Sequence, residues 1–294
     1  MKKKKMIAIS SLLLLALLLA AGYLWIRSDV PEMEFHYSAD EVYADWRLDK
    51  DGTVTVFGDG LLTWFKAEYS GRILELAQNG SIYAFLKWNL GKAYETFPAR
   101  RMIIKDGATG LMEGEYSFHA CDRLCEIIVD DSNPYFFSDN GVLFNKDKTV
   151  LLKYPENKRD GTYTVPGGVT EIAAEAFRNN AHLASVILPD GLEKVGAYAF
   201  CDCRRLSEVS LSEGLLCVGD YAFCNCRKLK SIAVPTSVQQ IDPYAFGFYF
   251  GGWTKNYDMA RVKAFKLISN DNAEAVKSYA QRYKIPIETG RTSK

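Results

Sequence analysis

Seven cysteines are the residues of this chain whose type and spacing could support chemistry. Two Cys-x-Cys pairs, Cys201/Cys203 and Cys224/Cys226, lie 23 residues apart. Four converging thiolates could bind zinc, although zinc-binding cysteines usually have at least two residues between them. Alternatively, Cys201 and Cys224 could form a disulfide if their Cα atoms lie about 5 Å apart, or the thiols could be small buried groups. The seven are Cys121, Cys125, Cys201, Cys203, Cys217, Cys224 and Cys226.

Catalytic motifs are absent from the sequence. None of the three histidines, His36, His119 and His182, lies in an H-E-x-x-H zinc motif. There is no G-x-S-x-G nucleophile motif and no phosphate loop ending in G-K-[ST]. The sequence therefore predicts a protein that is not an enzyme and uses no cofactor or metal. The alternative is an active site assembled from distant residues within 29–100.

A 23-residue repeat must position these side chains. Four phenylalanines recur at this interval, each preceded by alanine, with isoleucine or valine five residues earlier. In the first three units a leucine follows six residues later. The phenylalanines are Phe177, Phe200, Phe223 and Phe246. A fixed period of this length predicts a solenoid, in which each coil buries its apolar residues against its neighbours.

The unit at 186–208 indicates how one coil is built. Val186–Leu188 alternates in side-chain direction, which predicts a short strand. Pro189 ends this strand because it has no N–H group for a ladder bond, and Asp190-Gly191 predicts a turn. We expect the strands of neighbouring coils to pair in parallel, about 4.8 Å apart.

Other segments fit the same unit. Two match without a gap, Tyr163–Ser185 and Val209–Ser231. Met102–Glu126 matches with two extra residues, and Ile232–Phe246 matches until Gly252 stands where leucine is expected. The predicted repeat core is therefore Phe118, Phe177, Phe200, Phe223 and Phe246.

These residues resemble the BspA-like leucine-rich repeat family, whose unit reads roughly I-x-I-P-x-x-V-x-x-I-G-x-x-A-F-x-x-C-x-x-L. The resemblance covers about 102–288 and implies a hairpin insertion at Asn133–Pro155 and a closing segment at Ala273–Ile287. It also implies a surface or secreted protein, and most family members have no assigned activity. The cysteine position of the family unit, which favours a buried thiol, is occupied by Cys121, Cys203 and Cys226.

An apolar segment follows four lysines at the N-terminus. Met6–Ile26 has no charge, and as a helix it would be about 31 Å long, the thickness of a bilayer core. It is longer than the apolar region of most cleavable signals, and Leu19-Ala20-Ala21 does not fit a small-x-small cleavage site. The sequence thus predicts a single-pass membrane anchor, with a cleaved signal and a secreted protein as the alternative. The lysines predict a cytoplasmic N-terminus and extracytoplasmic repeats.

Four parts follow from these patterns, and together they predict an α+β repeat solenoid with short parallel strands. They are 1–28, the lysine run with the transmembrane helix or signal; 29–100, a small β-rich or mixed domain that caps the first coil; 101–268, the solenoid with its insertion at about 130–162; and 269–294, a helix–strand cap. In the last coil and the cap we expect strands at Lys263–Leu267 and Ile285–Ile287 and a helix at Asn272–Tyr283.

Two rows of side chains in repeat register could contact a partner. Four tyrosines stand two residues before a core phenylalanine, and Glu175 interrupts them: Tyr116, Tyr198, Tyr221 and Tyr244. They could hold a sugar or peptide by ring contact, or they could stabilise the turns. The second row could attract an anionic polymer, or it could be a solvated edge: Arg123, His182, Arg205 and Lys228.

The distribution of charge argues against nucleic acid as a partner. Residues 1–28 hold five basic and no acidic residues, so residues 29–294 hold 31 basic and 36 acidic ones. The part outside the anchor is mildly acidic, unlike a nucleic-acid-binding domain. The sequence therefore predicts a cell-surface scaffold that binds a protein, a glycan or an anionic polymer. A purely structural envelope protein is the further alternative.

The predicted anchor can be tested by fractionation. We expect the native protein to remain in the membrane fraction with its N-terminus intact, because an uncleaved apolar helix holds it in the bilayer. N-terminal sequencing of the membrane-bound protein checks this expectation. Mature protein that starts near Gly22 would contradict it.

Overall fold

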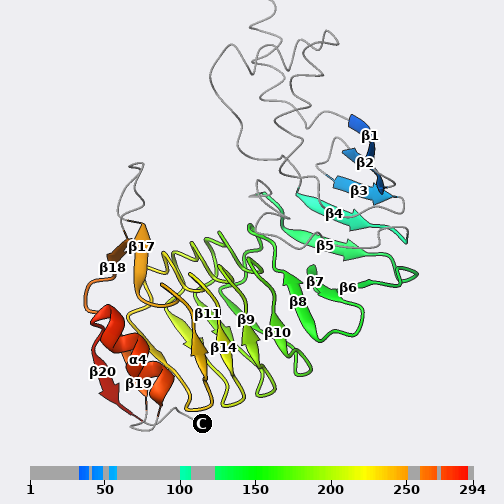
Figure 1. Cartoon of the computed structure of the whole chain (residues 1–294). Coiled ribbons are helices and arrows are strands. Elements are labelled where there is room, and N and C mark those ends of the chain that lie inside the picture. Colours follow the sequence, from blue (N-terminus) through cyan, green and yellow to red (C-terminus); the bar gives the residue numbers. More distant parts are fainter. Residues whose placement is uncertain are drawn as a thin grey trace, which may run out of the picture.

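Stacked coils of short strands form the main body of the computed structural model (Figure 1). The structure describes residues 33–39, 42–48, 53–57, 100–106, 123–250, 259–269 and 273–290. The predicted solenoid is confirmed, since equivalent strands of successive coils pair in parallel.

Two ladders of parallel strands run along the stack. The first ladder aligns Ile172, Val195, Val218 and Ile241. Its strands are β10 (Glu171–Ile172), β12 (Lys194–Val195), β14 (Cys217–Val218) and β16 (Gln240–Ile241). The second ladder begins with β9 (Thr162–Thr164), β11 (Ser185–Ile187) and β13 (Glu208–Ser210). In β11, Val186 is buried and Ile187 is exposed, as the alternation predicts.

A column of aromatic rings fills the centre of the stack. Successive phenylalanine rings lie 4.6, 4.9 and 5.3 Å apart from Phe177 to Phe246, nearly parallel and fully buried. Tyr154 stacks on Phe177 at 5.0 Å at one end. At the other end Tyr279 packs edge-on against Phe246 and donates its hydroxyl to the Phe246 carbonyl over 3.1 Å. The column is therefore closed at both ends, while Phe118 lies outside the described residues.

Glycine at one repeat position lets the coils approach closely. A Cβ atom on Gly196 would lie 2.6 Å from the Ala174 nitrogen, and one on Gly219 would lie 2.6 Å from the Ala197 nitrogen. Each glycine N–H instead donates to the preceding coil, to Ile172 and Val195 respectively, over 2.8 Å. Backbone contact therefore sets the spacing on which the ring column depends.

The inserted segment forms a hairpin that joins the first ladder. Strands β6 (Phe136–Asp139) and β7 (Val142–Asn145) are antiparallel. The turn between them contains Asn140 and Gly141, both at positive φ. Strand β8 (Val150–Lys153) then pairs antiparallel with β7 and parallel with β10. The hairpin thus continues the sheet instead of looping away from it.

A five-stranded sheet precedes the hairpin (Figure 1). Strands β1 (Met33–Ala39), β2 (Val42–Leu48) and β3 (Thr53–Phe57) are antiparallel. Strand β3 pairs in parallel with β4 (Arg101–Ile104), which pairs in parallel with β5 (Glu126–Val129). Arg101 aligns with Glu126, so this coil has 25 residues instead of 23.

The array changes form after Phe246. Strands β17 (Phe248–Phe250) and β18 (Met259–Arg261) form an antiparallel pair where the repeat pattern departs. The second face continues as β15 (Ser231–Ala233), β19 (Lys266–Ser269) and β20 (Ile287–Thr289). Helix α4 (Glu274–Tyr283) buries Val276, Tyr279 and Ala280. Strand β20 begins two residues later than predicted, because Ile285 is buried in the bend that follows the helix.

The predicted α+β class is wrong for the described residues, which form a β-solenoid with α4 as their single helix. The physical reason lies in the turns between the ladders. Tyr198 and Asp202 both have positive φ, as do Tyr221 and Asn225 in the next coil. Left-handed residues four apart interrupt any right-handed helix.

The predicted transmembrane helix at 6–26 lies outside the described residues. In the part of the chain that is described, no helix has the length and apolar character needed to cross a bilayer.

Truncation of a central ring tests the buried column. Phe223→Ala should lower the free energy of unfolding by about 3–5 kcal/mol, because it removes a buried ring between two others. Denaturant unfolding measures the loss. Ile187→Ala, at a side chain that is 46% exposed, is the control and should have a much smaller effect. An unchanged unfolding curve for Phe223→Ala would contradict the column.

Candidate interaction surface

The tyrosine row forms a second stack beside the core. Tyr198 and Tyr221 lie 4.9 Å apart, and Tyr221 and Tyr244 lie 5.3 Å apart, with nearly parallel rings. The Arg178 guanidinium lies 5.2 Å from the Tyr198 centroid, and Phe248 packs edge-on against Tyr244. Both faces of the central ring are thus covered, which favours a structural role over ring contact with a ligand. Tyr116 lies outside the described residues.

Glu175 replaces the tyrosine in the coil before Tyr198. It is 8% exposed, has positive φ and forms an ion pair with Arg178. Because Arg178 also lies over Tyr198, an ion pair and a cation–π contact continue the stack where the ring is missing.

The basic row divides into fixed and exposed members. His182 is half-buried and donates from Nε2 to Asn157 Oδ1 over 3.0 Å. Arg205 and Lys228 are exposed on the next two coils, and no acidic partner for them is seen among the described residues. Their neighbours are engaged: Arg204 pairs with Asp202 at 3.2 Å, and Arg227 lies 4.8 Å from the Tyr249 centroid. Arg205 and Lys228 are therefore exposed members of the row on the regular coils.

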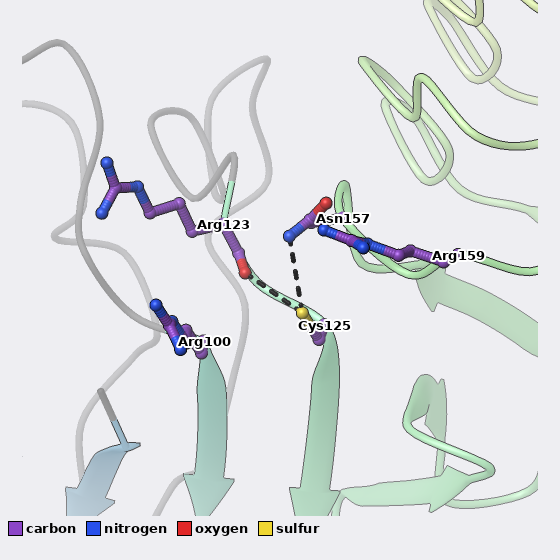
Figure 2. A pocket seen from close by; sticks show the side chains of 5 residues that line it. All are labelled: Arg100, Arg123, Cys125, Asn157 and Arg159. Carbon is purple, nitrogen blue, oxygen red and sulfur yellow. Dashed lines mark hydrogen bonds between the residues drawn. The ribbon is translucent and has the colours of Figure 1, made fainter. Parts of the chain in front are cut away.

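Arg123, the first member of the basic row, lines an open pocket of about 360 Å³ with four other residues (Figure 2). The lining residues are Arg100, Arg123, Cys125, Asn157 and Arg159. They come from three segments: the start of β4, the approach to β5 and the loop after β8. Three arginines give the described lining of the pocket a positive charge.

Backbone bonds hold the three segments together. The Cys125 N–H donates to the Arg100 carbonyl over 2.7 Å, and the Asn157 N–H donates to the Leu124 carbonyl over 2.9 Å. The Asn157 side chain donates to Cys125 Sγ over 3.6 Å while it accepts from His182. The pocket wall is thus linked to the next coil through His182.

The sequence pattern did not identify Arg100, Asn157 or Arg159 as site residues. Arg100 precedes the first coil and has no repeat equivalent, whereas Asn157 and Arg159 lie 23 residues before Asn180 and His182. The repeat signals for the pocket are therefore Arg123 and Arg159, which both share the repeat position of His182.

The cysteines of the repeats have structural contacts. Cys203 donates to the Phe177 carbonyl over 3.0 Å, and Cys226 donates to the Phe200 carbonyl over 3.1 Å. Burial raises the pKa of both thiols. A hydrogen bond with Cys224, followed by burial, raises the pKa of Cys201.

No disulfide joins the described cysteines, so Cys201 and Cys224 are adjacent free thiols and the disulfide interpretation is not supported. Within the described ranges, no group of histidine, cysteine, aspartate and glutamate residues is arranged as a metal site. Cys121 lies outside those ranges.

Residues 161–250 match, in six copies, the model of the BspA type leucine rich repeat region. This match supports the resemblance of residues 161–250 to the BspA-type leucine-rich repeat family. The matching model describes a repeat region and indicates no catalytic family. No curated protein matches the chain.

Solved structures of leucine-rich repeat proteins are similar to this chain. The pneumococcal vaccine antigen PcpA is 22% identical, with a TM-score of 0.47, over 66% of this chain and 56% of its own. A leucine-rich cell surface protein from Faecalibacterium prausnitzii is 23% identical, with a TM-score of 0.49, over 66% and 52%. A repeat protein from Eubacterium ventriosum is 14% identical, with a TM-score of 0.40, over 83% and 95%. The chain thus spans little more than half the length of the first two.

Alkylation of the folded protein tests the buried thiols. At neutral pH we expect iodoacetamide to modify Cys125, which is half-buried at the pocket, and to leave Cys203 and Cys226 intact. The thiolate is the reactive form, and a raised pKa reduces its population. Mass spectrometry before and after denaturation measures the difference. Rapid modification of Cys203 in the folded protein would contradict the burial.

Proposed function

We propose that this chain is a non-catalytic scaffold at the cell surface that binds a protein through its repeats. The observation that carries the proposal is the in-register stack, which repeats one side-chain position on each coil. Stacked repeats build extended surfaces of this kind, and such surfaces serve for binding.

The stack also gives the surface a fixed shape. Inter-coil backbone bonds, such as Phe200 N–H to the Ala222 carbonyl at 2.7 Å, recur from coil to coil. A surface that is ordered before it meets a partner loses little conformational entropy on binding. Side chains on adjacent coils can therefore act as one rigid group.

Charge indicates which partner the exposed edge suits. Arg205 and Lys228 are exposed in repeat register and have no acidic partner among the described residues. Complementary charge raises association rates and favours correct partners over wrong ones. We therefore propose a protein partner with an acidic surface.

The proposed location outside the membrane rests on the sequence of the N-terminal segment. Four lysines followed by the uncharged stretch Met6–Ile26 favour an anchor with a cytoplasmic N-terminus. The alternatives are an enzyme with its activity in 29–100 and a purely structural envelope protein. In the described parts of 29–100, three strands of the sheet are seen.

Charge reversal on the coil edge tests the proposal. The paired change Arg205→Glu and Lys228→Glu should reduce capture of the partner by roughly tenfold, because each change replaces attraction with repulsion. Quantitative cross-linking on cells that display the full chain measures the capture. Raising the salt concentration should weaken capture by the unaltered chain, since exposed charges are screened.

Lys263→Glu is the control, because Lys263 is also exposed but lies outside the row. Equal capture by the control and the paired variant would contradict a role for this edge. No partner captured by any form would favour the structural alternative.

A further inference from the structure

We infer that the pocket formed by Arg100, Arg123, Cys125, Asn157 and Arg159 binds a phosphate group. This inference goes beyond the scaffold function, because it concerns a small anion and a site separate from the exposed Arg205 and Lys228.

Three arginines line the pocket, and no carboxylate is found among the described residues that line it. Arginine remains charged at any physiological pH, so these lining residues together carry a charge of +3. An anion in the pocket is attracted by all three charges. An anion with two negative charges suits the site better than a single carboxylate.

The described acidic residues closest in sequence to Arg123 and Arg159 are already engaged. Glu126 forms an ion pair with Arg101. Asp160 pairs with Lys158 at 3.2 Å and accepts from the Tyr154 hydroxyl over 3.0 Å.

Glu156 is buried beside Lys153 at 3.5 Å. No ion pair to Arg100, Arg123 or Arg159 is seen within the described ranges. No described carboxylate therefore neutralises the three arginines.

The geometry provides donors from several directions. Figure 2 shows Arg100 and Cys125 at the ends of neighbouring strands, with Arg123 and Arg159 on loops to either side. A guanidinium presents paired N–H donors in a plane, which match the oxygens of a phosphate. Once their side chains turn toward the pocket, three such groups from separate segments can engage a tetrahedral anion, whereas a planar carboxylate has only two oxygens.

The frame of the pocket is fixed before any ligand arrives. The backbone bonds from Cys125 to Arg100 and from Asn157 to Leu124 join the three segments. Asn180 donates to the carbonyls of Pro155 and Lys158 over 2.9 and 3.1 Å, which holds the loop that carries Arg159. Only the arginine side chains need to become ordered on binding, so the entropic cost is small.

Calorimetry on the full chain in an uncharged detergent tests the site. We expect inorganic phosphate to bind with a stoichiometry of one and chloride at equal ionic strength not to bind. Arg123→Gln and Arg159→Gln should each weaken binding roughly tenfold, the usual effect of removing a charge-assisted hydrogen bond. Arg205→Gln, an exposed arginine outside the pocket, is the matched control and should bind as the unaltered chain does.

One further variant and one further ligand make the test decisive. Arg159→Lys preserves charge and should bind more weakly than the unaltered chain but more tightly than Arg159→Gln, because lysine lacks the planar fork. Glucose 6-phosphate distinguishes the sources of the group: binding assigns a phosphate ester, and exclusion assigns the free ion.

No binding of either probe at millimolar concentration would overturn the inference. Equal binding by the unaltered chain, Arg123→Gln and Arg159→Gln would also overturn it. The scaffold function is tested separately, since the Arg205→Glu and Lys228→Glu chain should still bind phosphate.

Discussion

Contact between like residues on neighbouring coils is the interaction on which this structure depends. Each coil contributes one phenylalanine ring, and that ring is buried only because the next coil supplies another at 4.6 to 5.3 Å. The same spacing between coils brings the backbone N–H donors of one coil within hydrogen-bond distance of carbonyls of the next. A single coil could satisfy neither requirement, so the coils stabilise one another as a stack.

The ends of the stack show how that requirement is met without a further repeat. Tyr154 takes the place of a phenylalanine at one end, and its hydroxyl bonds to Asp160. Tyr279, from helix α4, closes the other end and bonds to the backbone of Phe246 through its hydroxyl. Tyrosine suits a terminal position because its ring is apolar while its hydroxyl can bond at the edge of the core.

Strict register has a consequence for the surface. Any exposed position recurs on the next coil, so the sequence at that position determines whether a row is continuous. The tyrosine row packs on itself and serves stability, whereas Arg205 and Lys228 remain exposed. Where the period is broken, between Arg100 and Arg159, three segments meet in a pocket instead of a row.

The 23-residue period predicted the features that recur from coil to coil and little else of the fold. It predicted the parallel coils and the buried phenylalanines, because a fixed interval places equivalent residues against one another. Tyr154 lies 23 residues before Phe177, so extending the period by one unit would have indicated it as an end ring. Tyr279 lies outside the period, and its contact depends on the tertiary fold. The α+β class was wrong because residues such as Tyr198 adopt positive φ, which the residue types do not reveal. The pocket was missed because its residues come from three segments that only the tertiary fold brings together.

A double-mutant cycle on the ring column measures the central claim directly. Phe200 and Phe223 are in contact, with centroids 4.9 Å apart, whereas Phe177 and Phe223 are separated by the Phe200 coil. Alanine replacements at Phe200 and Phe223 should show a coupling of about 0.5–1.5 kcal/mol in the free energy of unfolding. Replacements at Phe177 and Phe223 should add to within about 0.5 kcal/mol. Additive losses for the adjacent pair would contradict a core built from ring-on-ring contact between coils.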